Sequence, residues 1–250
     1  MLSGLSTSSN ALTAFQTSLD NTSNNLANVN TTGFKRSVVN FQDLVYTGMQ
    51  NLQVGTGSKV GSITPKGFAQ GTITATGRNT DVALNGTGFL VVQMPDGSFQ
   101  YTRDGSFSQD ATGRLVTSQG YLVQPPITFP SDTTSITIGP DGTVTVNRSS
   151  APNAPKVLGQ LQVASFVNQE GLMIQPGNLY SETSASGPPT LGTAGSNGLG
   201  QIQQGSLEQS NVDLTTELTS LVSTQQAYVA NSKAVTTANQ MLTSSLALIS

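Results

Sequence analysis

The C-terminal fifth of the chain is free of the residues that break helices, since no glycine or proline follows Gly205. Apolar residues recur there every seven positions, with further leucines four positions after the first and after the fifth. These residues are Leu214, Leu218, Leu221, Tyr228, Val235, Leu242 and Leu246. The heptad predicts one helix over 212–249, about 57 Å long at 1.5 Å per residue. Ser210 or Asn211 is expected to cap it, with Asp213 and Glu217 favouring its dipole.

A second heptad lies at the other end of the chain. Its members are Leu5, Leu12, Phe15, Leu19 and Leu26. It predicts a helix over 3–29, frayed at its asparagine-rich end and stopped near Gly33. Helices as long as the C-terminal one occur mostly in coiled coils, membrane spans or repeats, and the polar Gln225, Ser232 and Asn239 disfavour lipid. Packing on one globular core and binding at a membrane surface remain alternatives.

Between the two predicted helices the composition and periodicity of the sequence change. Glycine and proline become frequent, and short β-rich runs alternate with turn signals such as Asp96-Gly97 and Asp141-Gly142. The expected fold class is α+β, with two long terminal helices in a coiled-coil-like domain and a mainly antiparallel β middle domain. The expected boundaries are 1–32 with 206–250 for the helices, 33–70 for an extended linker, and 71–205 for the β domain.

The composition excludes most catalytic chemistry. The chain has no histidine and no cysteine, which removes Ser-His-Asp and Cys-His catalysis and the commonest metal ligands. Asp104, Asp110 and Asp141 are expected to be turn residues that bond their own backbone. No catalytic, metal or cofactor site is therefore expected, although a hydrolase that uses carboxylates alone remains a minor alternative.

Charge and hydropathy limit the partners in the same way. Only 9% of the residues are charged, against about 25% in a typical protein, and the ten basic residues are scattered. This argues against nucleic-acid binding. No apolar run reaches about 18 residues, so no membrane insertion is expected. The N-terminus lacks the basic and apolar regions of a cleavable signal.

Three stretches of the chain together resemble the bacterial flagellar rod and hook protein family. The N-terminal one contains Asn24, Asn25, Ala27, Asn28, Gly33, Phe34 and Lys35, and the C-terminal one contains Ser210, Asn211 and Val212. The third is Tyr101-Thr102-Arg103-Asp104-Gly105-Ser106-Phe107, which looks most like the distal rod members. The three stretches occur in the family's order, and the resemblance extends over nearly the whole chain.

The resemblance implies a non-enzymatic structural subunit of the flagellar axis, polymerised into a hollow helical drive shaft that spans the periplasm. It implies that the terminal helices form the inner wall and the β domain the outer layer. The implied partners are copies of the chain, neighbouring rod and hook subunits, the L and P ring proteins and the flagellar type III export apparatus. The segment between Phe41 and Gly55 is short for a distal rod protein, so a hook or proximal-rod subunit of the same family remains an alternative. A secreted β-domain adhesin is a more distant one.

The apolar stripes of the two predicted helices form the expected assembly interface. Neither stripe can be hidden well on a lone subunit, so both are expected to complete their burial against neighbours. The interface residues are Leu5, Leu12, Phe15, Leu19, Leu26, Leu214, Leu218, Leu221, Tyr228, Val235, Leu242 and Leu246.

Overall fold

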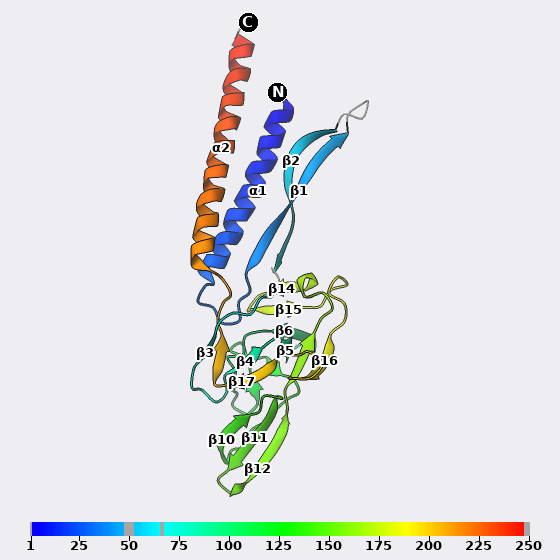
Figure 1. The fold of residues 1–250 in the computed structure, drawn as a ribbon, viewed down its shortest axis with the longest axis vertical. Coiled ribbons are helices and arrows are strands. Elements are labelled where there is room, and N and C mark those ends of the chain that lie inside the picture. The colour runs from blue at the N-terminus through cyan, green and yellow to red at the C-terminus, as the bar shows by residue number, and fades with distance from the viewer. Residues whose placement is uncertain (1, 48–52, 66–67, 248–250) are drawn as a thin grey trace. The chain divides into compact units, whose positions relative to one another are not determined.

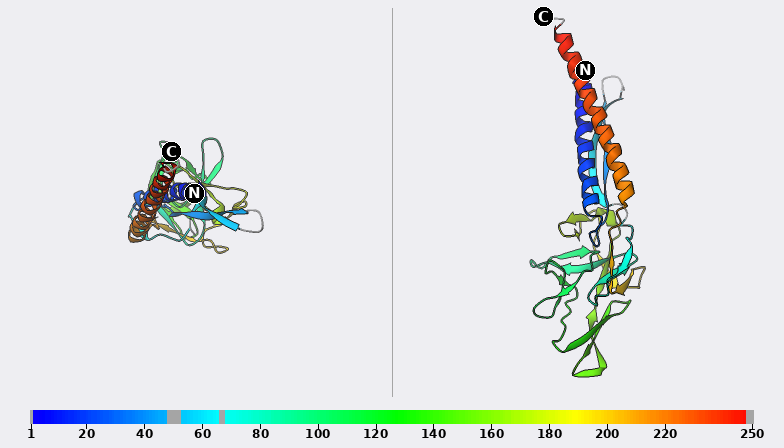
Figure 2. Two further views of the ribbon diagram at one scale, coloured as in Figure 1. Left: turned by 90° about the horizontal axis from the view of Figure 1, so that it is seen from above. Right: turned by 90° about the vertical axis from the view of Figure 1, so that its left-hand side faces the viewer.

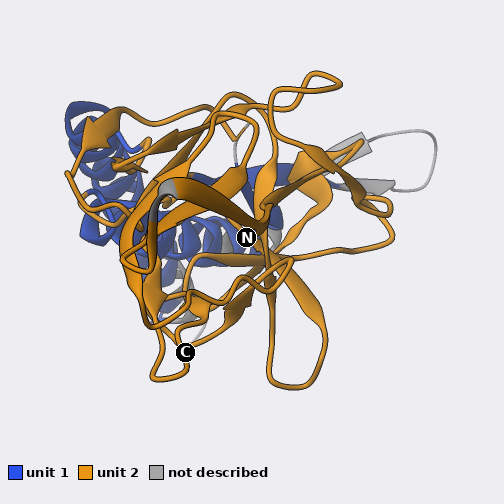
Figure 3. Ribbon diagram, turned by 90° about the horizontal axis from the view of Figure 1, so that it is seen from below, with its two compact units in different colours: residues 1–29, 37–65, 212–250 blue, residues 30–36, 66–211 orange. Residues whose placement is uncertain are grey.

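Two compact units make up the chain, one built mainly from helices and one from strands. The computed structural model describes residues 2–47, 53–65 and 68–247, and describes the backbone alone at 2–5, 45–47, 53–57, 152–153, 242 and 245–246. The helical unit comprises 1–29, 37–65 and 212–250, and the β unit comprises 30–36 and 66–211 (Figure 3). The α+β fold class predicted from the sequence is confirmed.

The helical unit contains two helices and a β-hairpin. Helix α1 (Leu2–Ala27) packs beside α2 (Leu214–Ala247), as Figure 1 and Figure 2 show from different sides. Helix α2 begins two residues later than predicted, because Asp213 caps it: its Oδ1 accepts a hydrogen bond of 2.7 Å from Thr216 N. The expectation that Ser210 or Asn211 supplies the cap was therefore wrong.

The expected linker 33–70 contains structure of its own. Strands β1 (Ser37–Thr47) and β2 (Gln53–Pro65) form an antiparallel hairpin that packs on α1 within the helical unit. Val39 on β1 is buried, and the rings of Phe15 and Phe41 lie 6.4 Å apart. Alternating apolar residues in β1 thus cover α1, so most of this segment is a packed hairpin.

The β unit is assembled from short antiparallel strands. They are β3 (Ile73–Ala75), β4 (Val82–Asn85), β5 (Phe89–Gln93), β6 (Phe99–Thr102), β7 (Ser108–Gln109), β8 (Leu115–Val116), β9 (Leu122–Val123), β10 (Thr133–Ile138), β11 (Thr143–Arg148), β12 (Ala151–Gln160), β13 (Gln162–Ser165), β14 (Met173–Gln175), β15 (Leu179–Ser181), β16 (Thr190–Thr193), β17 (Gln201–Gln204) and β18 (Ser206–Glu208). A single 3₁₀ turn, Gln169–Gly171, precedes β14.

The largest sheet of the β unit has the order β14-β15-β6-β5-β9-β8-β7, with β13 joining β5 to β16. Strands β10, β11 and β12 form a separate sheet, while β17 pairs with β4 and β18 pairs with β3. The predicted Asp-Gly turns are confirmed between β5 and β6 and between β10 and β11, where Gly97 and Gly142 have φ of 87° and 86°.

Two apolar clusters fill the β unit. The larger one runs from Val82 and Leu84 through Phe107 and Leu161 to Ile202. The second is aromatic and consists of Phe68, Phe89, Val91, Tyr101, Ala164, Phe166, Leu172 and Tyr180. Its rings meet mostly edge to face, at centroid distances of 4.8 to 5.9 Å. Strands from both ends of the β unit's sequence contribute to the larger cluster.

Both expected borders of the helical domain differ from the structural ones. Residues 30–36 belong to the β unit, and 206–208 form β18 within it, although 1–32 and 206–250 were expected together. The cause is burial of polar side chains at both borders, since Lys35 and Glu208 are enclosed in the β unit. The segment that follows α1 and the segment that precedes α2 therefore both belong to the β unit.

Candidate assembly surface and motif clusters

One group of motif residues joins α1, α2 and the start of β1. The Asn25 side chain is buried, and its Nδ2 donates to Ser37 O at 2.9 Å and to Glu217 Oε2 at 3.3 Å. Its Oδ1 accepts from Ser37 N at 3.1 Å, and Asn21 Oδ1 accepts from Ser37 Oγ at 2.7 Å. Asn25 uses both its donor and its acceptor, so it fixes three elements of the helical unit against one another.

Glu217 lies in the first turn of α2, where the dipole argument expected it. It is 1% exposed and also receives the Asn25 hydrogen bond, a contact that the sequence analysis did not foresee. The sequence does contain a signal for this role, because Glu217 is the one acidic residue between Leu214 and Ala247. Its burial accords with the rule that a carboxylate is fully buried in a protein almost only when it has a partner.

A second group of motif residues forms a buried ion cluster in the β unit. Lys35 Nζ lies 2.6 Å from Glu208 Oε1, and Arg103 Nη1 lies 3.3 Å from Glu208 Oε2. The three side chains are at most 2% exposed. The formal charge of this ion cluster is +1. Burial lowers the pKa of Lys35 and of Arg103, and the Glu208 carboxylate opposes both shifts.

Backbone groups complete the ion cluster. Lys35 Nζ donates to Ala69 O at 2.9 Å, and Arg103 Nη2 donates to Gly86 O at 2.9 Å. Glu208 Oε1 also accepts from Gly71 N at 2.8 Å. The guanidinium of Arg103 stacks over the Phe89 ring, with Cζ 5.4 Å from its centroid. Each charged side chain therefore has a hydrogen-bond partner outside the cluster, as buried ions require.

Gly33 and Asn211 attach the two motif ends to the β unit. Gly33 has φ of +67°, and a Cβ there would lie 2.5 Å from Asp104 N. Its N–H donates to Glu208 O at 2.8 Å. Asn211 Oδ1 accepts from Arg36 N at 2.8 Å, and its Nδ2 donates to Ala69 O at 2.9 Å. Asn211 thus bonds to the chain beside Lys35, which explains why it does not cap α2.

The remaining motif residues have less specific environments. Asn28 Nδ2 donates to Asn24 O at 2.9 Å, which satisfies one carbonyl at the end of α1. Asn24 and Ala27 are exposed, Phe34 and Ser210 are half-buried, and Val212 is buried. Sequence reasoning missed Ser37 and Glu208 as members of these clusters, and assigned no role to Arg103. The signal for Glu208 and Arg103 was charge in β-rich runs of a chain with few charges, whereas Ser37 had no such signal.

The predicted interface residues divide into two environments. Leu12, Phe15, Leu19, Leu26, Leu221, Tyr228 and Val235 are half-buried, whereas Leu214 and Leu218 are exposed. The side chains of Leu5, Leu242 and Leu246 lie outside the part of the chain whose side chains are described. Leu214 and Leu218 therefore lie on the solvent side of α2 in the single chain.

Two valines extend this exposed pair into a stripe. Leu214, Leu218, Val222 and Val229 are 44 to 58% exposed and fall within one face of α2, which we call the outer stripe. The less exposed face of α2 contains Leu221, Tyr228 and Val235 together with the polar Glu217, Thr224 and Asn231. Helix α2 therefore has large apolar residues on both its inward and its outward side. Heptad counting missed the two valines because they follow the predicted Leu221 and Tyr228 by one position.

The outer stripe borders a shallow groove on α2. The groove is lined by Leu218, Thr219, Val222, Ser223 and Gln226 and has a volume of about 420 Å³. Its floor consists of two aliphatic side chains between hydroxyl and amide groups. Such a surface can receive a hydrophobic side chain of another helix.

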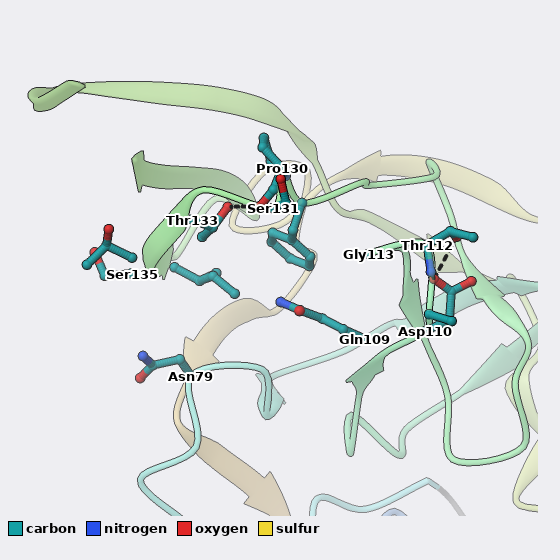
Figure 4. Close-up of a pocket in the computed structure, with 13 residues that line it drawn as sticks. Asn79, Gln109, Asp110, Thr112, Gly113, Pro130, Ser131, Thr133 and Ser135 are labelled. Atoms are coloured by element: carbon teal, nitrogen blue, oxygen red, sulfur yellow. Dashed lines mark hydrogen bonds between the residues drawn. The ribbon is translucent and has the colours of Figure 1, made fainter. Parts of the chain in front are cut away.

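The β unit contains a polar pocket of about 450 Å³ between the β7–β8 turn and β10. Figure 4 shows Gln109 between Asp110 at one side and Ser135 at the other. Asp110 is the one charged residue in its lining, and its carboxylate accepts hydrogen bonds from Thr112 N, Thr112 Oγ1, Arg114 N and Arg114 Nε. These bonds hold the pKa of Asp110 well below its usual range. A carboxylate so occupied is a poor proton acceptor.

The predicted turn aspartates are confirmed. Asp104 Oδ1 accepts from Ser106 N at 3.0 Å, and Asp141 Oδ1 accepts from Thr143 N at 3.1 Å, in the same pattern as Asp110 and Thr112. Within the ranges that the structure covers, no three acidic side chains come close enough to hold a metal ion. Neither described helix is both long and apolar enough to cross a bilayer.

Comparison with known families agrees with this anatomy. Residues 5–35 match the flagella basal body rod protein model, 83–146 match the D1 domain model of flagellar hook proteins FlgE/F/G, and 203–248 match the C-terminal model of flagellar basal body rod FlgEFG proteins. The chain is 43% identical to the flagellar basal-body rod protein FlgG of a Buchnera aphidicola strain, over 97% of this chain and 98% of that protein. It is 42% identical to the FlgG proteins of Borreliella burgdorferi and Caulobacter vibrioides, over at least 96% of each chain.

Proposed function

This chain belongs to the flagellar basal-body rod protein family and is a structural subunit of the flagellar axis, and we propose that it polymerises into the distal rod. Its likeness to FlgG proteins extends over nearly the whole chain, including the segment 33–70. The family places the chain in the rod of the flagellar basal body. The rod in this proposal is a hollow helical shaft that spans the periplasm and transmits torque to the hook.

The outer stripe of α2 is the observation that supports polymerisation. Leu214, Leu218, Val222 and Val229 remain about half exposed in the single chain. Burying the exposed half of one such side chain stabilises an association by roughly 1 kcal/mol, about half the value for complete burial. A contact between this stripe and a different surface of the next copy does not close on itself, so it produces a helical filament.

The proposed arrangement puts α1 and α2 in the inner wall and the β unit in the outer layer. The partners are then copies of this chain, neighbouring rod and hook subunits, the L and P ring proteins and the flagellar type III export apparatus. The function is structural and not enzymatic. The saturated carboxylate of Asp110 and the absence of histidine and cysteine from the sequence support that view.

The test is assembly of purified full-length variants. Leu218→Asp and Val222→Asp each place a charge in the outer stripe, and we expect both to prevent filament formation while the β unit stays folded. Thr237→Asp is the matched control, since Thr237 is an exposed residue of α2 outside the stripe. Filaments are counted by electron microscopy and pelleting, and folding is monitored by hydrogen exchange. Filaments of either stripe variant at the wild-type yield would contradict the proposed contact.

A further inference from the structure

The segment 201–208, called the closing segment here, contributes strand partners to two earlier strands. β17 pairs with β4 from Gln201 opposite Asn85 to Gln204 opposite Val82, and β18 pairs with β3. Among the strands that the structure describes, β4 and β3 have no other neighbours. Figure 1 shows β17 beside β4. Strand β4 is fully buried from Val82 to Leu84, so it cannot leave its hydrogen-bonding edge open to water.

The closing segment also bonds to the sheet formed by β10, β11 and β12. Gln204 Nε2 donates to Ile136 O at 2.9 Å, and Gln204 Oε1 accepts from Ile138 N at 3.0 Å. The side-chain amide of Gln204 thus makes the same pair of hydrogen bonds to β10 that a peptide group of a neighbouring strand would make. Ile202 N donates to Pro140 O at 2.9 Å. The segment therefore connects parts of the β unit that come from distant stretches of the chain.

The last residue of the closing segment neutralises buried charge. Glu208 is the counter-ion of Lys35 and of Arg103 in the ion cluster. Without Glu208, a β unit folded around the remaining residues would enclose two cations with no anion between them. The penalty for such uncompensated burial is several kcal/mol, which is comparable to the whole stability of a domain.

We infer that the β unit does not fold without the closing segment, which is the last stretch of the chain that its folding requires. A chain that emerges N-terminus first, during synthesis or transport through a pore, keeps the β unit open until Glu208 has arrived. Lys35, Arg103 and strand β4 all precede the closing segment in the chain. Until it is present, the two cations lack their counter-ion Glu208 and β4 lacks its strand partner β17. This closing step is independent of whether the folded subunit then joins a rod.

Native-state hydrogen exchange of the full-length chain at increasing denaturant tests the dependence. The amides of β17 and β18 are expected to exchange through the same opening as those of β5 and β6, with the same denaturant dependence. Pulse labelling during refolding is expected to show β5 and β6 gaining protection together with the closing segment. An opening that exposes 201–208 while β5 and β6 stay protected would overturn the inference, as would their protection before the segment during refolding.

The Glu208→Gln variant provides a second test of the inference. We expect it to raise exchange throughout β4, β5 and β6 by about a hundredfold to a few thousandfold, because it leaves both cations without a counter-ion. Glu170→Gln removes the same charge from an exposed site of the same unit and is expected to leave these rates unchanged. Faster exchange confined to 201–208 would contradict the inference. If Glu208→Gln does not fold at all, the measurements on the wild-type chain still decide the question.

Discussion

Lys35 Nζ and Glu208 Oε1 lie 2.6 Å apart, although 173 positions separate the two residues in the chain. One of them follows α1 and the other precedes α2. Their ion pair is enclosed in the β unit together with Arg103, so the two segments that continue into the helices are fastened to the same point. The motif residues around them act within the subunit.

The charge of the ion cluster predicts an unequal response to substitution. Lys35→Met leaves a balanced Arg103–Glu208 pair, and both acceptors of Lys35 keep a second donor, from Gly71 N and Asn211 Nδ2. We expect it to lower the free energy of unfolding of the β unit by about 1 kcal/mol. Glu208→Gln is expected to lower it by roughly 3–5 kcal/mol.

Denaturant unfolding measures these losses, and a double variant sharpens the comparison. Adding Lys35→Met to Glu208→Gln removes one of the two unpaired cations and is expected to restore part of the lost stability. Lys156→Met, at an exposed position, is the control and is expected to restore none. A larger loss for Lys35→Met than for Glu208→Gln would show that the net charge does not govern this site.

Asn25 gives a prediction for the helical unit. Asn25→Asp replaces the donor to Ser37 O and Glu217 by a second carboxylate beside Glu217. We expect the helical unit to lose about 3 kcal/mol or more, since buried groups lose partners and like charges meet. Hydrogen exchange in α1 and α2 measures the loss. Asn24→Asp, one position earlier and exposed, is expected to have little effect, and equal losses for the two variants would contradict the assigned role.

Gly33 allows backbone strain and steric contact to be separated. Gly33 and Gly77 both have positive φ, +67° and +74°, but a Cβ at Gly77 meets nothing within 4 Å whereas one at Gly33 meets the backbone of Asp104 at 2.5 Å. Gly77→Ala is expected to cost only the backbone penalty of about 1 kcal/mol. Gly33→Ala is expected to cost roughly 2 kcal/mol more. Thermal unfolding of both variants measures the difference, and equal costs would rule out the close approach.

Two buried tyrosines predict a loss of stability at alkaline pH. Burial, reinforced by Glu182, raises the pKa of Tyr101 to about 12, and burial also raises the pKa of Tyr180. The folded β unit therefore keeps protons that the unfolded chain releases above about pH 10. Stability is complete below that pH and falls as the pH rises toward the folded-state values. The lowered pKa of Lys35 acts in the opposite direction, but only below the ordinary lysine value of 10.5.

Unfolding curves measured between about pH 9 and about pH 12 test this prediction. Tyr180→Phe keeps the ring and removes one titrating group, so the alkaline decline of the β unit is expected to become shallower. Tyr228→Phe, in the helical unit, is expected to leave the decline of the β unit unchanged. An undiminished slope for Tyr180→Phe would show that another group is responsible.

The sequence predicted the elements with strong local signals and missed those defined by distant contacts. The two helices, the β middle and the Asp-Gly turns follow from periodicity and turn chemistry, which are local. The hairpin β1–β2 was missed because its apolar residues, such as Val39, acquire a partner only when α1 is in place. Strand β18 was missed because three residues have no measurable period, and its pairing with β3 spans about half of the chain.

The same limit applies to the candidate site. Family likeness identified Lys35, Asn25 and Asn211, but their partners Glu208, Glu217 and Arg36 come from separate stretches, and no periodicity connects them. The heptad residues Leu221, Tyr228 and Val235 are half-buried on the side of α2 that also carries Glu217. Leu214 and Leu218 lie on the exposed side, because a seven-residue count does not distinguish the two edges of the stripe.

The opposed faces of α2 have an evolutionary consequence. The contacts that hold the subunit together use one side of the helix, through Glu217 and its polar neighbours. The aliphatic residues Leu218 and Val222 lie on another side and remain about half exposed. Under the proposed assembly, substitutions in the outer stripe change how strongly subunits adhere more than they change how well each one folds. A lineage would then be able to stiffen or loosen its assembly while the monomer stays folded.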